Sequence, residues 1–149
     1  NSAVSDVSGV IDFYEIDDST ACHTTIPTRA PSKKLSVTAI TLDGFVKEKD
    51  LSVDVIKMDI EGGEPRALRG MRDTLSQNRA LSIVMEFNPD ALAESGTTPR
   101  DVISYLKSQG LEVYAILEGG KRGPLSSDLA GMTMYKGRSA YANVLFVKE

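Results

Sequence analysis

The sequence has little cysteine, no basic excess and no long apolar run. Its single cysteine, Cys22, rules out a disulfide within the 149 residues and is typical of a reducing compartment, so we expect a cytoplasmic protein. No apolar stretch approaches the roughly 20 residues that a membrane-spanning helix needs. The formal net charge is −4, without the clustered Lys and Arg that neutralise phosphates, so nucleic acid is not an expected partner.

The two common nucleotide-binding loops are also absent. No GxGxxG follows a first strand, and no Walker-type loop occurs. The sequence therefore contains no recognisable phosphate-binding loop for a nucleotide. The length suits one domain that can bury a core, and the 41% hydrophobic and 26% charged residues are ordinary for a globular protein.

Hydrophobic periodicity predicts strands that alternate with helices. The expected strands are residues 10–16, 35–40, 53–58, 81–87, 111–117 and 142–148. One helix starts at Glu64 and buries Ala67, Leu68, Met71 and Leu75, and another runs from a Thr98 cap to Gly110. Residues 17–34 form the longest expected loop. This alternation indicates an α/β domain with a mostly parallel sheet.

Acidic residues follow two of these strands. Asp59, Glu61 and Glu64 come after the strand at 53–58, and Glu86 ends the strand at 81–87. If the two strands are parallel neighbours, all four carboxylates converge on one edge of the sheet. They could then bind a hard cation, act as a general base or hold a cationic group. Alternatively, Glu61 and Glu64 only cap the next helix.

Other polar residues favour structural roles. Lys57, inside an apolar strand, is expected to extend to solvent or to pair with a nearby acid. Asp43 is expected to cap the short helix after it. Cys22 and His23 lack the second Cys or His pair of a zinc site, so no residue is assigned to a metal.

Several segments resemble the FkbM family of methyltransferases. Family members typically show a TLD element, an IKxDxEGxE stretch, a leucine and a glycine in the next helix, and a strand that ends in Glu. The corresponding residues are 41–43, 55–64, 68–71 and 83–86, and residues 3–6 with Gly9 and Phe13 resemble an upstream family segment. The likeness covers residues 3–86 and extends more loosely to 147.

The resemblance implies a Rossmann-like class I methyltransferase whose last strand is antiparallel. Such enzymes use S-adenosylmethionine, usually to methylate a hydroxyl on a sugar, lipid or natural-product acceptor. Asp59 would lie beside the transferred methyl group and Glu86 on the substrate side. With Glu61 and Glu64, which shape the site or hold a divalent ion, they are the expected catalytic residues. Ser5 and Asp6 near the adenine, together with Asp59, are the expected cofactor contacts.

The family pattern also includes a first strand with a glycine-rich cofactor loop and a second strand with a ribose-binding acid. Neither occurs in this sequence, so we expect residues 1–149 to be a single, N-terminally truncated methyltransferase domain. In the family's sheet the fourth strand pairs with the first. Residues 53–58 would then form an uncovered apolar edge, and we expect either that the chain forms homo-oligomers through it or that this edge is partly disordered.

Two other classes of function remain open. The chain could be a non-catalytic α/β interaction module that no longer binds the cofactor. It could also be a metal-dependent hydrolase, although no histidine accompanies the acids.

Overall fold

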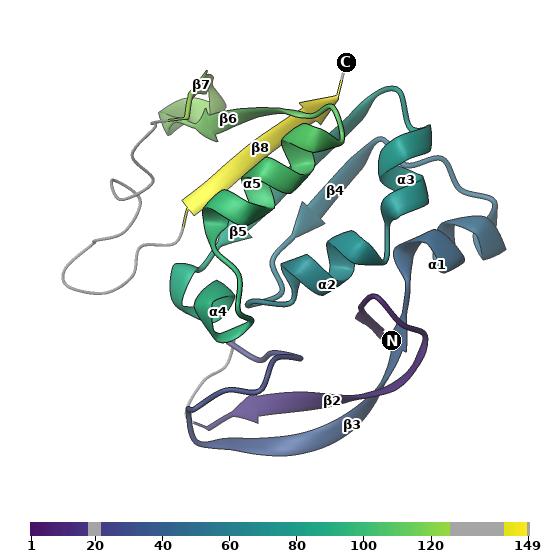
Figure 1. The fold of residues 1–149 in the computed structure, drawn as a ribbon, viewed down its shortest axis with the longest axis vertical. Coiled ribbons are helices and arrows are strands. Elements are labelled where there is room, and N and C mark those ends of the chain that lie inside the picture. The colour runs from purple at the N-terminus through teal and green to yellow at the C-terminus, as the bar shows by residue number, and fades with distance from the viewer. Residues whose placement is uncertain (18–21, 126–141, 149) are drawn as a thin grey trace.

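The computed structural model describes residues 1–17, 22–125 and 142–148. Figure 1 shows a main sheet with helices in front of it and a long hairpin below. The strands are β1 (Ala3–Val4), β2 (Gly9–Ile16), β3 (Ser32–Ile40), β4 (Val55–Met58), β5 (Leu81–Phe87), β6 (Glu112–Ile116), β7 (Arg122–Pro124) and β8 (Ala142–Lys148). The helices are α1 (Leu42–Lys49), α2 (Glu64–Arg69), α3 (Arg72–Gln77), α4 (Pro89–Glu94) and α5 (Pro99–Ser108), with a 3₁₀ turn at Glu118–Gly120.

The main sheet has the strand order β4-β5-β8-β6-β7. Strands β4 and β5 are parallel, whereas β8 is antiparallel to both β5 and β6, and β7 is antiparallel to β6. The expected antiparallel last strand is confirmed. The expectation of a mostly parallel sheet was wrong for the described strands, because β8 inserts between β5 and β6 and gives each of them an antiparallel partner.

A second sheet has the order β1-β3-β2. Strands β2 and β3 form an antiparallel pair from Gly9–Ala39 to Ile16–Ser32, and β1 runs parallel to β3. The predicted loop at 17–34 was therefore too long, since β3 begins at Ser32. Lys34 forms an ion pair with Asp12 across the hairpin at 2.8 Å, which explains a charged residue in this strand.

The core lies between the main sheet and the helices in front of it. Every second side chain of β5 is buried, and the residues concerned are Leu81, Ile83, Met85 and Phe87. They belong to one cluster with Val102, Ile103 and Leu106 of α5, the helix that crosses in front of β5 and β8 (Figure 1). The predicted capping box at Thr98 and Asp101 is present and begins α5. The alternate residues of β5, including Val84 and Glu86, lie on the other face and are half-buried.

The single helix predicted after Glu64 is two short helices. All four residues of its predicted apolar face are buried, but the helix is interrupted at Gly70 and Met71, between α2 and α3. A Cβ atom on Gly70 would clash with the backbone oxygen of Ser5. This close approach explains why a glycine stands at the end of α2.

The strands β1 and β7 and the helix α4 lie outside the predicted strands and helices. The signal for α4 is visible in the sequence, because Asn88 accepts a bond from the backbone N–H of Ala91 and Pro89 takes the first helical position. No helix in the described part of the chain is long and apolar enough to cross a membrane.

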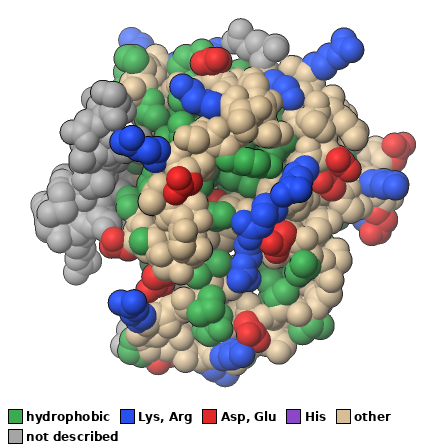
Figure 2. Space-filling view, in the orientation of Figure 1, with side chains coloured by type: hydrophobic (Ala, Val, Ile, Leu, Met, Phe, Trp, Pro, Cys, Tyr) green, Lys and Arg blue, Asp and Glu red, His purple; other side chains and the backbone are tan. Residues whose placement is uncertain are grey.

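Surface charges on the helix-bearing side are mixed. Figure 2 shows Lys and Arg side chains interspersed with Asp and Glu, and hydrophobic side chains exposed between them. Among the described residues, this face therefore has no large patch of one charge that would mark a binding site, and the contacts of the individual acids define the candidate site.

Candidate functional site

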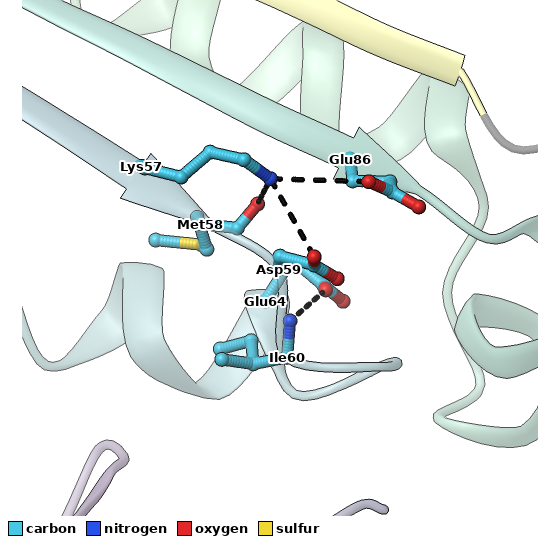
Figure 3. Close-up of polar contacts among 6 residues, drawn as sticks. All are labelled: Lys57, Met58, Asp59, Ile60, Glu64 and Glu86. Atoms are coloured by element: carbon cyan, nitrogen blue, oxygen red, sulfur yellow. Dashed lines mark hydrogen bonds and ion pairs between the residues drawn. The ribbon is translucent and has the colours of Figure 1, made fainter. Parts of the chain in front are cut away.

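The carboxyl ends of β4 and β5 meet at one edge of the main sheet. The register pairs Lys57 with Val84 and Met58 with Met85, so Asp59 follows β4 next to the place where Glu86 lies on β5. Figure 3 shows the ammonium group of Lys57 facing both of these acids. Its Nζ lies 3.7 Å from Asp59 Oδ2 and 3.9 Å from Glu86 Oε2. The predicted pairing of Lys57 with a nearby acid is confirmed.

Glu61 connects the turn after β4 to two other parts of the fold. Its backbone has a φ of +48°, a left-handed conformation that is uncommon for a residue with a side chain. The Thr24 hydroxyl donates to the Glu61 carbonyl oxygen at 2.6 Å, and Asn88 Nδ2 donates to Glu61 Oε2 at 2.7 Å. These bonds hold the turn against the segment that precedes β3 and against the start of α4.

Gly62 continues this turn with a φ of +89°. A Cβ atom here would lie 2.5 Å from the Ala91 carbonyl oxygen, so α4 approaches the turn as closely as its backbone allows. The glycine therefore serves both the turn conformation and the packing of α4.

Glu64 is buried, with 2% of its surface exposed. Its Oε1 accepts a hydrogen bond from the backbone N–H of Ile60 at 3.3 Å, whereas Oε2 has no hydrogen-bond partner among the described residues. Burial raises the pKa of the Glu64 carboxyl above its ordinary value, although backbone N–H groups of the turn oppose this effect, and the Glu61 charge adds to it. Glu64 thus lies beneath the turn that carries Asp59 and Glu61.

Of the four predicted acids, Asp59 and Glu86 contact the same residue, whereas Glu61 and Glu64 have other surroundings. Asp59 and Glu86 share Lys57, Glu61 bonds to Asn88, and Glu64 is enclosed. In the ranges that the structure describes, no three His, Cys, Asp or Glu side chains lie so as to hold a metal ion. The alternative of a divalent ion at Glu61 and Glu64 therefore has no ligand set there.

Ser5 and Asp6, the other predicted cofactor contacts, lie after β1 and face the end of α2. Ser5 is buried and its hydroxyl donates to Asp6 Oδ1 at 3.1 Å. Arg69 binds Asp6 Oδ2 through two nitrogen atoms, at 2.9 and 3.0 Å. Burial alone would raise the pKa of Asp6, but the bonds from Arg69 and Ser5 more than offset it, so the pKa lies below its ordinary value.

Asp43 was predicted to cap the helix that follows it, and this was wrong. Thr41 caps α1, because its hydroxyl accepts from the Gly44 backbone N–H at 3.1 Å. Asp43 instead accepts from the backbone N–H groups of Asp73 and Thr74, at 3.0 and 2.8 Å, and from the Thr74 hydroxyl at 2.7 Å. It caps α3 from 30 residues away, which sequence spacing could not show.

A cavity of about 190 Å³ opens beside Glu61. Thr24 and Thr28 line it from the segment before β3, and Asp90 and Glu94 line it from α4. The segment 17–34, expected as the longest loop, therefore contributes side chains to a cavity at the turn after β4. Residues 18–21 of that segment lie outside the described residues.

A mixed α/β sheet with acids after two parallel neighbouring strands is consistent with a methyltransferase fold. A family model described as "Methyltransferase FkbM domain" matches residues 2–113 of the 149. The chain belongs to this family. Comparisons with curated proteins and with solved structures gave no significant match.

Proposed function

We propose that this protein is an S-adenosylmethionine-dependent methyltransferase that methylates a hydroxyl group on a sugar, lipid or natural-product acceptor. The observation that carries the proposal is the position of Asp59 and Glu86 in a member of this family. Both acids lie at one sheet edge, within 4 Å of the Lys57 ammonium group, where ligands of α/β sheets bind. The family match does not favour the alternative of a non-catalytic interaction module.

Methyl transfer to an alcohol requires a positioned hydroxyl and a group that accepts its proton. The side chains of Asp59 and Glu86 are 48% and 25% exposed, so an acceptor can reach either of them. We assign proton acceptance and hydroxyl positioning to this pair. Glu61 and Glu64 shape the turn that presents Asp59, through the bonds of Glu61 to Thr24 and Asn88 and the bond of Glu64 to Ile60.

S-adenosylmethionine supplies an electrophilic methyl group on a positively charged sulfur when it is bound. The residues at this edge suit such a group, because two carboxylates and one ammonium leave a net charge of −1. Asp59 would hold the cofactor at the reacting end. Ser5 and Asp6 would hold it at the other end, since a carboxylate that already accepts from Ser5 and Arg69 keeps further lone pairs for a ligand.

The free edge of β4 supports the proposal that residues 1–149 form part of a larger unit. Among the described strands, β4 pairs with β5 and with no other, and Val55 on this strand is 66% exposed. An unpaired apolar edge readily accepts another strand. We propose that a strand with cofactor-binding residues pairs here, either from a longer form of the polypeptide or from a second copy.

The test is isothermal titration of S-adenosylmethionine into the chain and into a longer polypeptide that includes upstream coding sequence. We expect micromolar binding to the longer polypeptide, and weaker binding to residues 1–149. Asp59→Asn should weaken binding at least about tenfold, and Asp12→Asn, in the ion pair of the β2–β3 hairpin, should leave it unchanged. If neither polypeptide binds the cofactor, the proposal is refuted.

Methyl transfer from radiolabelled cofactor to a panel of glycans, lipids and small alcohols would then identify the acceptor. Glu86→Gln should lower the rate by the 10²–10⁴-fold that a general base contributes. A rate that is insensitive to both Asp59→Asn and Glu86→Gln would show that these acids do not act on the hydroxyl proton.

A further inference from the structure

Lys57 is an unexpected residue for its place in the fold. It is the third residue of the four-residue strand β4, whose other members are Val55, Ile56 and Met58. Lysine is disfavoured in strands, where branched and aromatic side chains are preferred. Its register partner Val84 lies on the face of β5 that points away from the buried core, so the Lys57 side chain extends along that face to the sheet edge.

The contacts of Lys57 do not explain it as a stabilising residue. Its Nζ is 3.5 Å from the Met58 carbonyl oxygen, 3.7 Å from Asp59 and 3.9 Å from Glu86, all longer than a good hydrogen bond. The Lys57 side chain is 51% exposed. Ion pairs of this kind contribute little to folding stability, since solvent screens them.

The same contacts place one positive charge beside two negative charges. Without the ammonium, two carboxylates at the ends of adjacent strands would repel each other and separate. With it, each acid is attracted to the same ammonium group, and Figure 3 marks both ion pairs with dashed lines. A divalent cation that bridges the two carboxylates would bind close to this ammonium group, at about 2.0–2.6 Å from the acidic oxygens, and would be repelled by it.

We propose that Lys57 supplies the positive charge that positions Asp59 and Glu86 and that its ammonium group excludes a divalent cation from this pair of acids. This inference rests on the proposed function, because it assigns Lys57 the task of holding the two acids that receive the acceptor hydroxyl. Lys57 acts through Asp59 and Glu86 and is therefore a positioning residue. It leaves the edge with one net negative charge, which suits an incoming positively charged sulfur centre.

The inference predicts a gain of metal binding when Lys57 is replaced. One unit charge about 4 Å away changes the affinity for a divalent cation at least about fivefold, even at the dielectric constant of water. The test is titration of Mn²⁺ into the isotope-labelled full chain, with paramagnetic broadening of the backbone amide signals as readout. Lys57→Met should bind Mn²⁺ at least about fivefold more tightly than the wild type, with broadening centred on Asp59 and Glu86.

Three further variants make the result specific. Lys57→Arg keeps the charge and should behave like the wild type. Lys34→Met is the matched control, because it frees Asp12 from an ion pair of 2.8 Å elsewhere in the chain and should not broaden the signals of Asp59 or Glu86. Adding Glu86→Gln to Lys57→Met should abolish the gain.

Equal Mn²⁺ affinity in Lys57→Met and the wild type would overturn the inference, and so would a gain in Lys57→Arg. If Lys57→Met does not fold, Lys57→Gln takes its place with the same expected gain and the same refuting result. The experiment needs neither cofactor nor acceptor. Absence of methyl transfer would therefore refute the proposed function alone, whereas absence of the Mn²⁺ gain would refute the role of Lys57 alone.

Discussion

Replacing Gly62 with alanine should destabilise the protein through two separate effects. Gly62 has a φ of +89°, and its missing Cβ would lie 2.5 Å from the Ala91 carbonyl oxygen. Gly96 offers a matched control, because its φ is +77° but nothing lies within 4 Å of the position of its Cβ. Both substitutions impose left-handed strain and restrict the unfolded chain equally, whereas only Gly62→Ala adds the clash.

The expected magnitudes follow from these two geometries. A left-handed conformation costs an L-residue roughly 1–2 kcal/mol, so Gly96→Ala should lower the free energy of unfolding by about that amount. Overpacking against a backbone that must shift costs a further 1–3 kcal/mol, roughly. Gly62→Ala should therefore lose about 2–5 kcal/mol. Since 1 kcal/mol corresponds to about 2–4 °C for a domain of this size, its melting temperature should fall at least about 2–4 °C below that of Gly96→Ala.

Urea unfolding followed by circular dichroism measures both free energies on the same chain. A second readout is the side-chain amide signal of Asn88, which should move in Gly62→Ala, because the clash displaces α4 and the bond from Asn88 to Glu61. It should stay in place in Gly96→Ala. If Gly62→Ala is no less stable than Gly96→Ala, the close approach of Ala91 does not constrain this turn and the reasoning fails.

Two other substitutions test contacts that sequence spacing did not show. Asp43→Ala removes three bonds to the start of α3 and should cost about 1–2 kcal/mol of unfolding free energy, more than Thr41→Ala, which removes one bond at α1; equal losses in urea unfolding would contradict the capping of α3 by Asp43. Glu64 has a raised pKa in the folded state, so the protein loses stability from this group as pH rises from near its ordinary pKa of 4.5 toward the folded pKa. The free energy of unfolding of Glu64→Gln minus that of the wild type should therefore be larger at pH 7 than at pH 4. A difference that does not change with pH would show that Glu64 titrates normally.

Elements with a strong local pattern could be predicted from the sequence. Strands β5 and β8 have the predicted boundaries because their apolar runs end at turn residues or polar residues. Helix α5 was found because the capping box of Thr98 and Asp101 is a local signal. Apolar alternation does not show which strand is the neighbour, however, so the insertion of β8 between β5 and β6 could not be foreseen.

The geometry of the candidate site could be predicted where it depends on the ends of adjacent strands. Asp59 and Glu86 lie at one edge because β4 and β5 are parallel neighbours, as the βαβ pattern indicates. The burial of Glu64 could not be predicted, since glutamate is almost never fully buried without a partner. The interruption of the helix at Gly70 could not be predicted either, because it follows from contact with the backbone of Ser5, which is far away in the sequence.

The bonds of Glu61 have a consequence for engineering. Thr24 and Asn88 attach two surface segments to the same left-handed turn that follows Asp59. A graft that exchanges the segment before β3 to alter acceptor choice would therefore also act on the position of a candidate catalytic acid. Such chimeras should preserve Thr24 and Asn88, so that a changed acceptor preference can be separated from a displaced carboxylate.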